Sequence, residues 1–209
     1  ASTLSAATLG SGSPVAQYVV GGTTFGVATF NLKTATAGTV ATVRELRFST
    51  TGTDAVESIT VGGVTAPVVS GTSTVTGLNL VIGSTGTDVP VTVKYSGFQN
   101  STTGGSLQTS VASTVVTLSY IEATSGSGTV ITNGTLVASN AMKLVASKPT
   151  VTVAAGGATA SSLVLGAENK IGEFTVSADA NGKISIGTTS LSLSAIGVTN
   201  VEFSSLRIA

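Results

Sequence analysis

Hydrophobic and polar residues alternate along most of this chain with a period of two residues. Between Val27 and Lys33, the side chains of Ala28, Phe30 and Leu32 fall on one side of an extended chain, and Val27 and the polar residues fall on the other. This alternation is typical of a β-strand with one buried face. The same pattern, rich in β-branched residues, predicts further strands at Val40–Phe48, Ser58–Val61, Val75–Ile82, Val89–Tyr95, Val111–Ile121 and Thr129–Val137.

Short clusters of Gly, Asn, Asp and Ser separate the predicted strands. The run TSGSG at 124–128 predicts a hairpin turn. Asn181-Gly182 is the dipeptide most typical of a two-residue hairpin, because both positions of that turn need a positive φ. Gly21-Gly22 and Gly62-Gly63 are predicted to end strands. Since no segment shows the 3.6-residue period of a helix, the sequence predicts an all-β fold.

A strand–turn–strand sequence occurs twice in the chain. VATFNLKTATAGTVAT at 27–42 returns as IGEFTVSADANGKISI at 171–186, and a shift of 144 residues aligns Phe30 with Phe174. The leading segments TLSAATL and PTVTVAA also correspond loosely. Apolar positions and turn glycines recur while surface residues differ, which is typical of duplicated domains; the alternative is chance similarity in a Thr/Val/Gly-rich β protein. We expect two tandem Ig-like β-sandwich domains, at 1–146 and 147–209, with LVASKPT at 144–150 as the connector.

The second repeat is expected to be incomplete within this chain, because it lacks counterparts of the strands that follow Val61 in the first. A few strands with an unpaired edge and a half-covered apolar face are marginal alone. Three explanations stay open: a longer protein continues beyond Ala209, another copy of the chain supplies the missing strands, or the short unit folds by itself. The second explanation makes the contact head-to-tail, so its repetition gives a filament unless a ring closes.

The composition points to a neutral surface rich in hydroxyl groups. Charged residues form only 9% of the chain, against roughly 25% in an ordinary soluble domain, and hydrophobic residues form 41%. The net charge of zero removes the self-repulsion that keeps proteins apart in solution. The scattered charges make no basic patch for nucleic acid or an anionic membrane, and no window is apolar enough to span a bilayer. We therefore expect the partners to be copies of the same protein.

The sequence carries few residues suited to catalysis or metal binding. It contains no His, Cys or Trp, so the usual general base, disulfides and thiolate metal sites are excluded; we expect no enzyme activity and no cofactor. Glu45 is expected to form a surface ion pair with Arg44. Asp88, in STGTDVP, and Asp179, in SADANGKIS, are assigned to turns. A loose calcium site that uses Asp179 or Glu168 with backbone carbonyls is the alternative.

Two features bear on glycans. Asn100 and Asn133 each begin an N-x-S/T triplet in polar, loop-like surroundings, which is the acceptor pattern for N-glycosylation; the alternative is chance in a Thr-rich chain. Aromatic residues are sparse, and Phe30 and the other strand phenylalanines are predicted to lie in the core. Tyr95 and Phe98, on either side of the YSGF turn, are the pair best placed to bind a surface glycan.

The segments EFTVSADANGKISI and LNLVIGSTGTDVPVTVKYSG, with the connector LVASKPTVTV, resemble tandem Ig-like β-sandwich domains of large microbial surface proteins. These include S-layer-type proteins and adhesive filament subunits. The resemblance covers most of the chain and lies in the style of strands and turns. It implies an exported structural or adhesive protein, and the N-terminal sequence ASTLSAA is compatible with a mature end left by a signal peptidase. The sequence has neither a type IV pilin helix nor an LPxTG signal.

We therefore expect a structural subunit of an extracellular filament or surface array, assembled head to tail by β-strand complementation between subunits. The alternative is an adhesin or glycan-binding module at a cell or phage surface, with an exposed aromatic or acidic cluster around Tyr95–Gln99. The residues expected at the subunit interface are apolar positions of the N-terminal strand and of the second repeat: Leu4, Leu9, Phe174, Val176, Ile184, Leu191, Leu193, Phe203, Leu206 and Ile208.

Overall fold

A computed structural model describes most of the first 153 residues and parts of the remainder. The described residues are 2–52, 54–97, 113–134, 136–153, 164, 167, 170, 172–178, 184, 186–188 and 190. Among these residues the regular structure consists of strands, with no helix, so the prediction of an all-β fold is confirmed. Five of the expected interface residues lie outside the described residues: Leu191, Leu193, Phe203, Leu206 and Ile208.

The described residues form a series of β-strands. The strands are β1 (Thr8–Leu9), β2 (Gln17–Val20), β3 (Thr24–Leu32), β4 (Val40–Thr50), β5 (Val56–Val61), β6 (Val64–Pro67), β7 (Thr72–Gly83), β8 (Thr87–Tyr95), β9 (Ser113–Thr114), β10 (Val116–Ser125), β11 (Val130–Asn133), β12 (Val137–Ala138), β13 (Met142–Val145), β14 (Thr150–Val153) and β15 (Phe174–Ser177). Each stretch expected from alternation contains strand. The one expected at Val111–Ile121 is divided into β9 and β10, with 111–112 outside the described residues, and the one expected at Thr129–Val137 is divided into β11 and β12.

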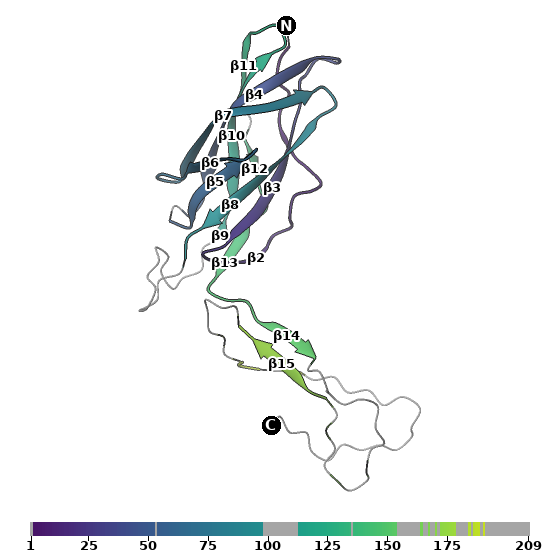
Figure 1. Ribbon diagram of the computed structural model, residues 1–209, viewed down its shortest axis with the longest axis vertical. Helices are drawn as coiled ribbons and strands as arrows, with labels where there is room; N and C mark the ends of the chain where they lie inside the picture. The colour runs from purple at the N-terminus through teal and green to yellow at the C-terminus, as the bar shows by residue number, and fades with distance from the viewer. Residues whose placement is uncertain are drawn as a thin grey trace.

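Two antiparallel sheets form a sandwich. One has the order β1-β3-β8-β5-β6, and the other has β11-β10-β4-β7 with β12 beside β10. Figure 1 shows these sheets stacked along the upper part of the molecule, near the N-terminus. Phe30 of β3 and Phe48 of β4 meet between the sheets, with ring centroids 6.3 Å apart. Both are fully buried, as predicted, because opposed inner faces of two sheets remove apolar side chains from water.

The inward face of β3 contains the residues that alternation predicts, and one more. Ala28, Phe30 and Leu32 are buried. Val27 was expected on the polar side, but it is buried as well. The register between β3 and β8 shifts between Gly26 and Ala28, and such a bulge turns two consecutive side chains to the same side of a strand.

The turns follow the glycine-rich sequences. Gly62 and Gly63, with φ of 56° and 82°, form the two-residue hairpin between β5 and β6, as type I′ turns require. The TSGSG sequence joins β10 and β11 as expected. The assignment of Asp88 to a turn is wrong: it lies within β8, opposite Asn31 of β3, and accepts a hydrogen bond of 2.8 Å from the Asn31 amide.

A third, smaller sheet lies at the end of the sandwich away from the N-terminus. Its order is β2-β13-β9, and β13 runs parallel to β2. Met142 and Leu144 of β13 are buried in the sandwich core. The connector expected at 144–150 is therefore shorter than predicted, since β13 continues to Val145 and β14 begins at Thr150.

Strands β14 and β15 form an antiparallel pair separate from the other sheets, in the lower part of Figure 1. In this pair, Val153 lies opposite Phe174. In the β1–β3 pair, Leu9 lies opposite Phe30. Val153 and Phe174 lie 144 residues after Leu9 and Phe30, which is the offset of the sequence repeat. The neighbouring positions of the two strand pairs correspond in the same way.

Candidate functional site

Strands β14 and β15 carry apolar side chains on one face and hydroxyl side chains on the other. Val151 lies opposite Val176, and Val153 lies opposite Phe174. Residues directly opposite each other in an antiparallel pair project to the same side. The remaining positions of both strands are Thr or Ser. The four apolar residues Val151, Val153, Phe174 and Val176 make up a surface that we call the apolar face of β14–β15.

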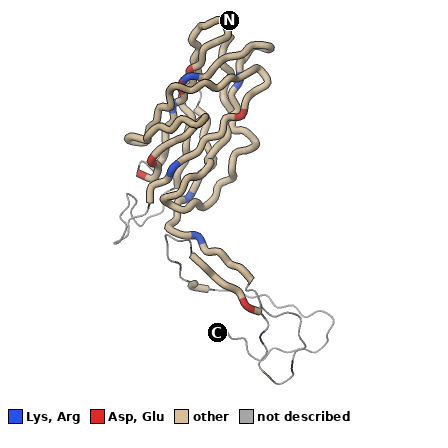
Figure 2. Tube along the Cα trace, viewed as in Figure 1, with Lys and Arg blue, Asp and Glu red and all other residues tan. Residues whose placement is uncertain are grey.

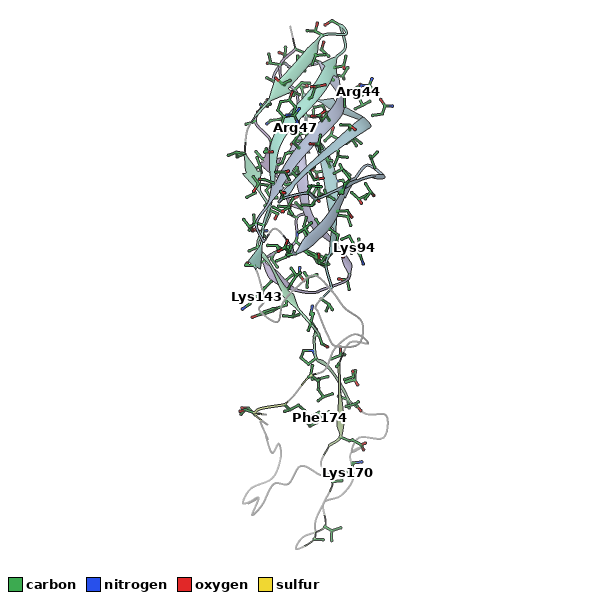
Figure 3. The ribbon with its side chains drawn as sticks, turned by 90° about the vertical axis from the view of Figure 1, so that its left-hand side faces the viewer. Arg44, Arg47, Lys94, Lys143, Lys170 and Phe174 are labelled. Carbon is green, nitrogen blue, oxygen red and sulfur yellow. The ribbon has the colours of Figure 1, made fainter. Side chains whose placement is uncertain are left out.

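The apolar face of β14–β15 is largely exposed, whereas its counterpart is core. Val151, Val153 and Phe174 are 64%, 84% and 40% exposed. At the 144-residue offset, Ala7 and Phe30 of the first sandwich are buried. Figure 3 shows Phe174 on the thin lower part of the molecule, well separated from Arg44 and Arg47 on the sandwich. The β1–β3 pair is thus covered by an opposing sheet, whereas the equivalent β14–β15 pair is exposed.

The edges of the two strand pairs also differ. In the first sandwich, β3 is paired with β1 on one edge and with β8 on the other. Within the described part of the chain, β15 is paired with β14 and with no second strand. A strand that is paired on one edge only presents backbone N–H and C=O groups on its other edge, and these can pair with an added strand.

The predicted interface residues occupy two separate places. Leu4 and Leu9 pack against the core of their own sandwich, where Leu9 lies opposite Phe30 and Leu4 forms a bridge with Thr34. Phe174 and Val176 lie on the apolar face of β14–β15, and Ile184 is half-buried. A role for these residues in contacts between subunits stays a prediction.

A second candidate surface lies on the outer face of the β11-β10-β4-β7 sheet. Arg47 of β4 forms an ion pair with Glu45, at 2.6 Å between Nε and Oε1, and its guanidinium lies 4.3 Å from the centre of the Tyr120 ring. The Tyr120 hydroxyl donates to Glu122 Oε2 at 3.2 Å. Glu45 and Glu122 lie directly opposite each other on β4 and β10. We call Glu45, Arg47, Tyr120 and Glu122 the outer cluster.

Each member of the outer cluster has a charged or polar neighbour within it. The hydrogen bond that Arg47 donates to Glu45, together with the negative charge of that carboxylate, raises the pKa of Arg47. Desolvation raises the pKa of Tyr120, and its hydrogen bond to Glu122 and the charge of that carboxylate act in the same direction. Within the outer cluster, the positive charge of Arg47 is therefore paired with Glu45, and Glu122 is held by the Tyr120 hydroxyl.

The sequence indicated a different ion pair. Glu45 was expected to pair with Arg44, and this is wrong: the β4–β7 register shifts between Val43 and Glu45, and Arg44 instead donates to Asn79 at 3.0 Å. The contribution of Tyr120 was missed altogether. Alternation alone could have placed it on the outer face, but the register of β4 against β10 joins residues far apart in sequence and has no local signal.

The residues expected to bear on glycans are placed as follows. The Asn133 amide donates to the carbonyl oxygens of Leu4 and Ser5 at 3.3 and 3.0 Å, so a glycan on this nitrogen would disturb both contacts. Tyr95 was expected near an exposed aromatic site, but it is fully buried and accepts a hydrogen bond of 3.5 Å from Thr114. Asn100 and Phe98 lie outside the described residues.

A shallow groove of about 360 Å³ lies where the connector leaves the sandwich. Lys148 donates from Nζ to the Tyr18 carbonyl at 3.2 Å, and Lys143 Nζ lies 5.4 Å from the centre of the Tyr18 ring. The connector itself forms part of the wall, through Lys148 and Pro149. These contacts hold the connector against β2. The groove is therefore the junction between the connector and the sandwich.

Charge and metal-binding residues are sparse over the described part of the chain. Figure 2 shows Lys, Arg, Asp and Glu scattered along the trace rather than gathered in one large patch. Among the described residues, no three potential metal ligands come together, and no helix is long and apolar enough to cross a membrane. Asp179 and Glu168, the alternative calcium ligands, lie outside the described residues.

No protein-family model and no curated protein matches the chain. Among solved structures, the chain is similar to a cohesin module from a family 33 glycoside hydrolase of Clostridium perfringens. That similarity has a TM-score of 0.40 at 17% sequence identity, and it covers 68% of this chain and 96% of the cohesin chain. A similarity at this level carries no argument about function.

Proposed function

We propose that this chain is a structural subunit of an extracellular filament or surface array, in which subunits join head to tail by β-strand complementation. The observation that carries the proposal is the exposed apolar face of β14–β15, on a strand pair in which β15 has no second partner strand among the described residues. An exposed apolar strand pair of this kind is unstable alone. Covering it with a strand from a neighbouring subunit buries apolar surface and pairs the exposed backbone groups in one step.

The geometry favours a polymer over a closed pair. The acceptor, β14–β15, and the sandwich formed by β1 to β13 are different structures at different positions in the chain. A contact between an acceptor on one subunit and a different surface on the next is heterologous, and such contacts continue as a filament unless a ring closes. The zero net charge supports close packing of many copies. Location outside the cell, at the cell surface, is part of this proposal and depends on the sequence resemblance.

Electron microscopy and light scattering of two matched variants would test the proposal. Val153→Lys places a charge on the apolar face of β14–β15, and Val81→Lys places the same charge at another exposed valine, on β7 of the sandwich. We expect filaments or arrays from the unaltered chain and from Val81→Lys, and loss of assembly in Val153→Lys. Monodisperse particles of 20.3 kDa from the unaltered chain at every concentration would overturn the proposal.

The alternative function, an adhesin or glycan-binding module, has less support at its expected position. That function was expected to place an exposed aromatic or acidic cluster around Tyr95–Gln99, and Tyr95 is fully buried. The outer cluster does present a tyrosine ring, but Arg47 already lies over it. Binding of surface glycans therefore stays an alternative without a described site.

A further inference from the structure

The dipeptide Asn133-Gly134 lies where strand β11 ends, beside the N-terminal segment. Asn133 is the last residue of β11 and pairs with Ile121. It is half-buried, whereas Gly134 is exposed. Asn133 Nδ2 donates to the carbonyl oxygens of Leu4 and Ser5 at 3.3 and 3.0 Å. The side-chain amide of this dipeptide is therefore part of what holds the N-terminal segment on the sandwich.

Nothing among the described residues requires a glycine at position 134. Its φ lies outside the left-handed region, and a Cβ at this position would meet no described atom within 4 Å beyond its chain neighbours. The glycine does provide access, because a backbone nitrogen whose Cα carries no side chain can approach the Cγ atom of the preceding asparagine. For this reason Asn-Gly is the dipeptide most prone to lose its side-chain amide as ammonia.

We propose that Asn133 is a site of spontaneous deamidation and that its conversion releases the N-terminal segment. The Gly134 nitrogen attacks Asn133 Cγ and forms a cyclic succinimide. The Cγ–Nδ2 bond breaks, and ammonia leaves with the proton of the Gly134 N–H. Water then opens the ring at either carbonyl, which leaves aspartate or isoaspartate at position 133. An amide and water thus become a carboxylic acid and ammonia, with no oxidant or reductant.

The product of this reaction cannot hold the N-terminal segment. A carboxylate only accepts hydrogen bonds, so it would face the carbonyl oxygens of Leu4 and Ser5 with no proton to donate. Two hydrogen bonds are then replaced by repulsion between oxygen atoms. Strand β1 is only two residues long, so few ladder bonds remain to keep the segment in place. Its release would free the edge of β3 that β1 covers.

The same two hydrogen bonds control when the reaction occurs. While they are intact, they hold the Asn133 amide toward the N-terminal segment and resist the rotation that brings Cγ to the Gly134 nitrogen. The reaction therefore requires local opening of the segment. Because deamidation is irreversible, it converts a reversible opening into a permanent one.

Timed incubation of the full 209-residue chain at mildly alkaline pH tests the site. Peptide mass spectrometry follows deamidation at position 133, and amide hydrogen exchange is measured over Leu4–Leu9. We expect the deamidated form to accumulate in the folded protein more slowly than in urea, by a factor similar to the protection of the Leu4–Leu9 amides. Gly134→Ala is the matched control, because it keeps the Asn133 amide and its contacts and should leave position 133 unmodified over the same time.

The release of the segment is tested on the product itself. Ion exchange separates aged protein, which carries an additional negative charge, from fresh protein. In the aged fraction, the Leu4–Leu9 amides should exchange at least about tenfold faster, since two hydrogen bonds are lost. Asn133→Asp should reproduce this result, and near-ultraviolet circular dichroism of the buried Tyr95 reports whether the sandwich stays folded. If that variant does not fold, the aged fraction remains the test.

Three results would overturn the proposal. An unmodified position 133 in the folded chain, after full conversion in urea, would show that the site is closed in the native protein. Equal rates in the folded chain and in urea would show that the contacts with the N-terminal segment do not control the reaction. Aged protein with unchanged exchange over Leu4–Leu9 would show that deamidation does not release the segment.

Discussion

Asn133 is a single side chain that holds the N-terminal segment on the first sandwich. Its amide nitrogen donates to the carbonyls of Leu4 and Ser5, which lie just before the two-residue strand β1. A strand this short supplies few ladder hydrogen bonds of its own. Each hydrogen bond from the amide contributes on the order of 0.5–1.5 kcal/mol to stability, so the side chain is a substantial part of what keeps this segment in place.

Replacing Asn133 should loosen the N-terminal segment. We expect Asn133→Ala to lower the free energy of unfolding by about 1–2 kcal/mol and to speed amide exchange over Leu4–Leu9, measured by urea denaturation and hydrogen exchange. Asn79→Ala is the matched control, because that exposed asparagine accepts one hydrogen bond, from Arg44, and should change stability by less than about 0.5 kcal/mol. Unchanged exchange over Leu4–Leu9 in Asn133→Ala would show that the backbone alone holds the segment.

The buried hydroxyl of Tyr95 makes stability depend on alkaline pH. Burial raises the pKa of Tyr95 above its ordinary value, while the hydrogen bond with Thr114 acts weakly in the opposite direction. In the unfolded chain Tyr95 loses its proton at about pH 10, but in the folded chain it keeps the proton to higher pH. Its contribution to stability is therefore complete below about pH 10 and is lost as the pH rises toward the folded pKa.

Tyr95→Phe should remove this part of the alkaline sensitivity. Above about pH 10, the unaltered protein should lose up to about 1.4 kcal/mol per pH unit more than the variant, measured as the free energy of urea unfolding at several pH values. All other ionisable groups are the same in both proteins, so their effects cancel in the comparison. Parallel pH profiles would show that Tyr95 ionises equally well in the folded and unfolded chains.

At the scale of elements, the register between strands decides which surface chemistry forms. Strands β4 and β10 bring Glu45 directly opposite Glu122, and like charges in this position are unfavourable. Arg47 offsets the repulsion by pairing with Glu45 and lying over Tyr120, which in turn holds Glu122. The outer cluster therefore exists only because two strands far apart in sequence are paired in this register.

Removal of Arg47 should expose the repulsion between the two carboxylates. We expect Arg47→Ala to lower the melting temperature, and we expect the loss to shrink at about 1 M salt, where the Debye length falls to roughly 3 Å. Adding Glu122→Gln to this variant should restore part of the loss. Arg44→Ala, which removes a neighbouring arginine bonded to Asn79, is the control and should have a smaller effect. A salt-independent loss in Arg47→Ala would point to lost packing instead.

Local alternation was enough to predict strands and the inward side of most of them, but not the places where the strand geometry is irregular. Phe30 and Phe48 were predicted in the core because period-two patterning is a local property. Val27 was missed because the bulge that buries it depends on pairing with β8. Pro90 lies inside β8, where the lack of an N–H is tolerated because β5 pairs with β8 only from Val91 onward.

Part of the apolar face of β14–β15 could also be predicted from the sequence, because it too depends on a local pattern of apolar residues. The repeat at an offset of 144 residues identified Phe174 and Val176, because duplicated core positions keep their apolar character. The partners Val151 and Val153 were seen only as a loose match, since a four-residue strand has too few positions for a distinct pattern. The choice of the N-terminal strand as donor could not be examined from sequence, because it depends on which edge of β3 the strand β1 occupies.

At the scale of the whole molecule, the distribution of charge sets how copies can associate. The chain has nine basic and nine acidic residues and a net charge of zero, and Figure 2 shows no large region of one sign over the described residues. Long-range electrostatic attraction or repulsion between copies is therefore weak. The forces left for assembly are burial of apolar surface and backbone hydrogen bonding, which act only at contact.

Assembly should consequently respond weakly to ionic strength and strongly to salts that are excluded from protein surfaces. Raising sodium chloride from about 0.01 M to about 1 M shortens the Debye length from roughly 30 Å to 3 Å, and we expect the assembled fraction, measured by light scattering and sedimentation, to change little. Sodium sulfate should increase it, because excluded salts strengthen apolar burial. Val81→Lys should assemble like the unaltered chain in low salt. Assemblies that dissolve in sodium chloride would show that ion pairs join the subunits, and β15 would then lose its role as the contact.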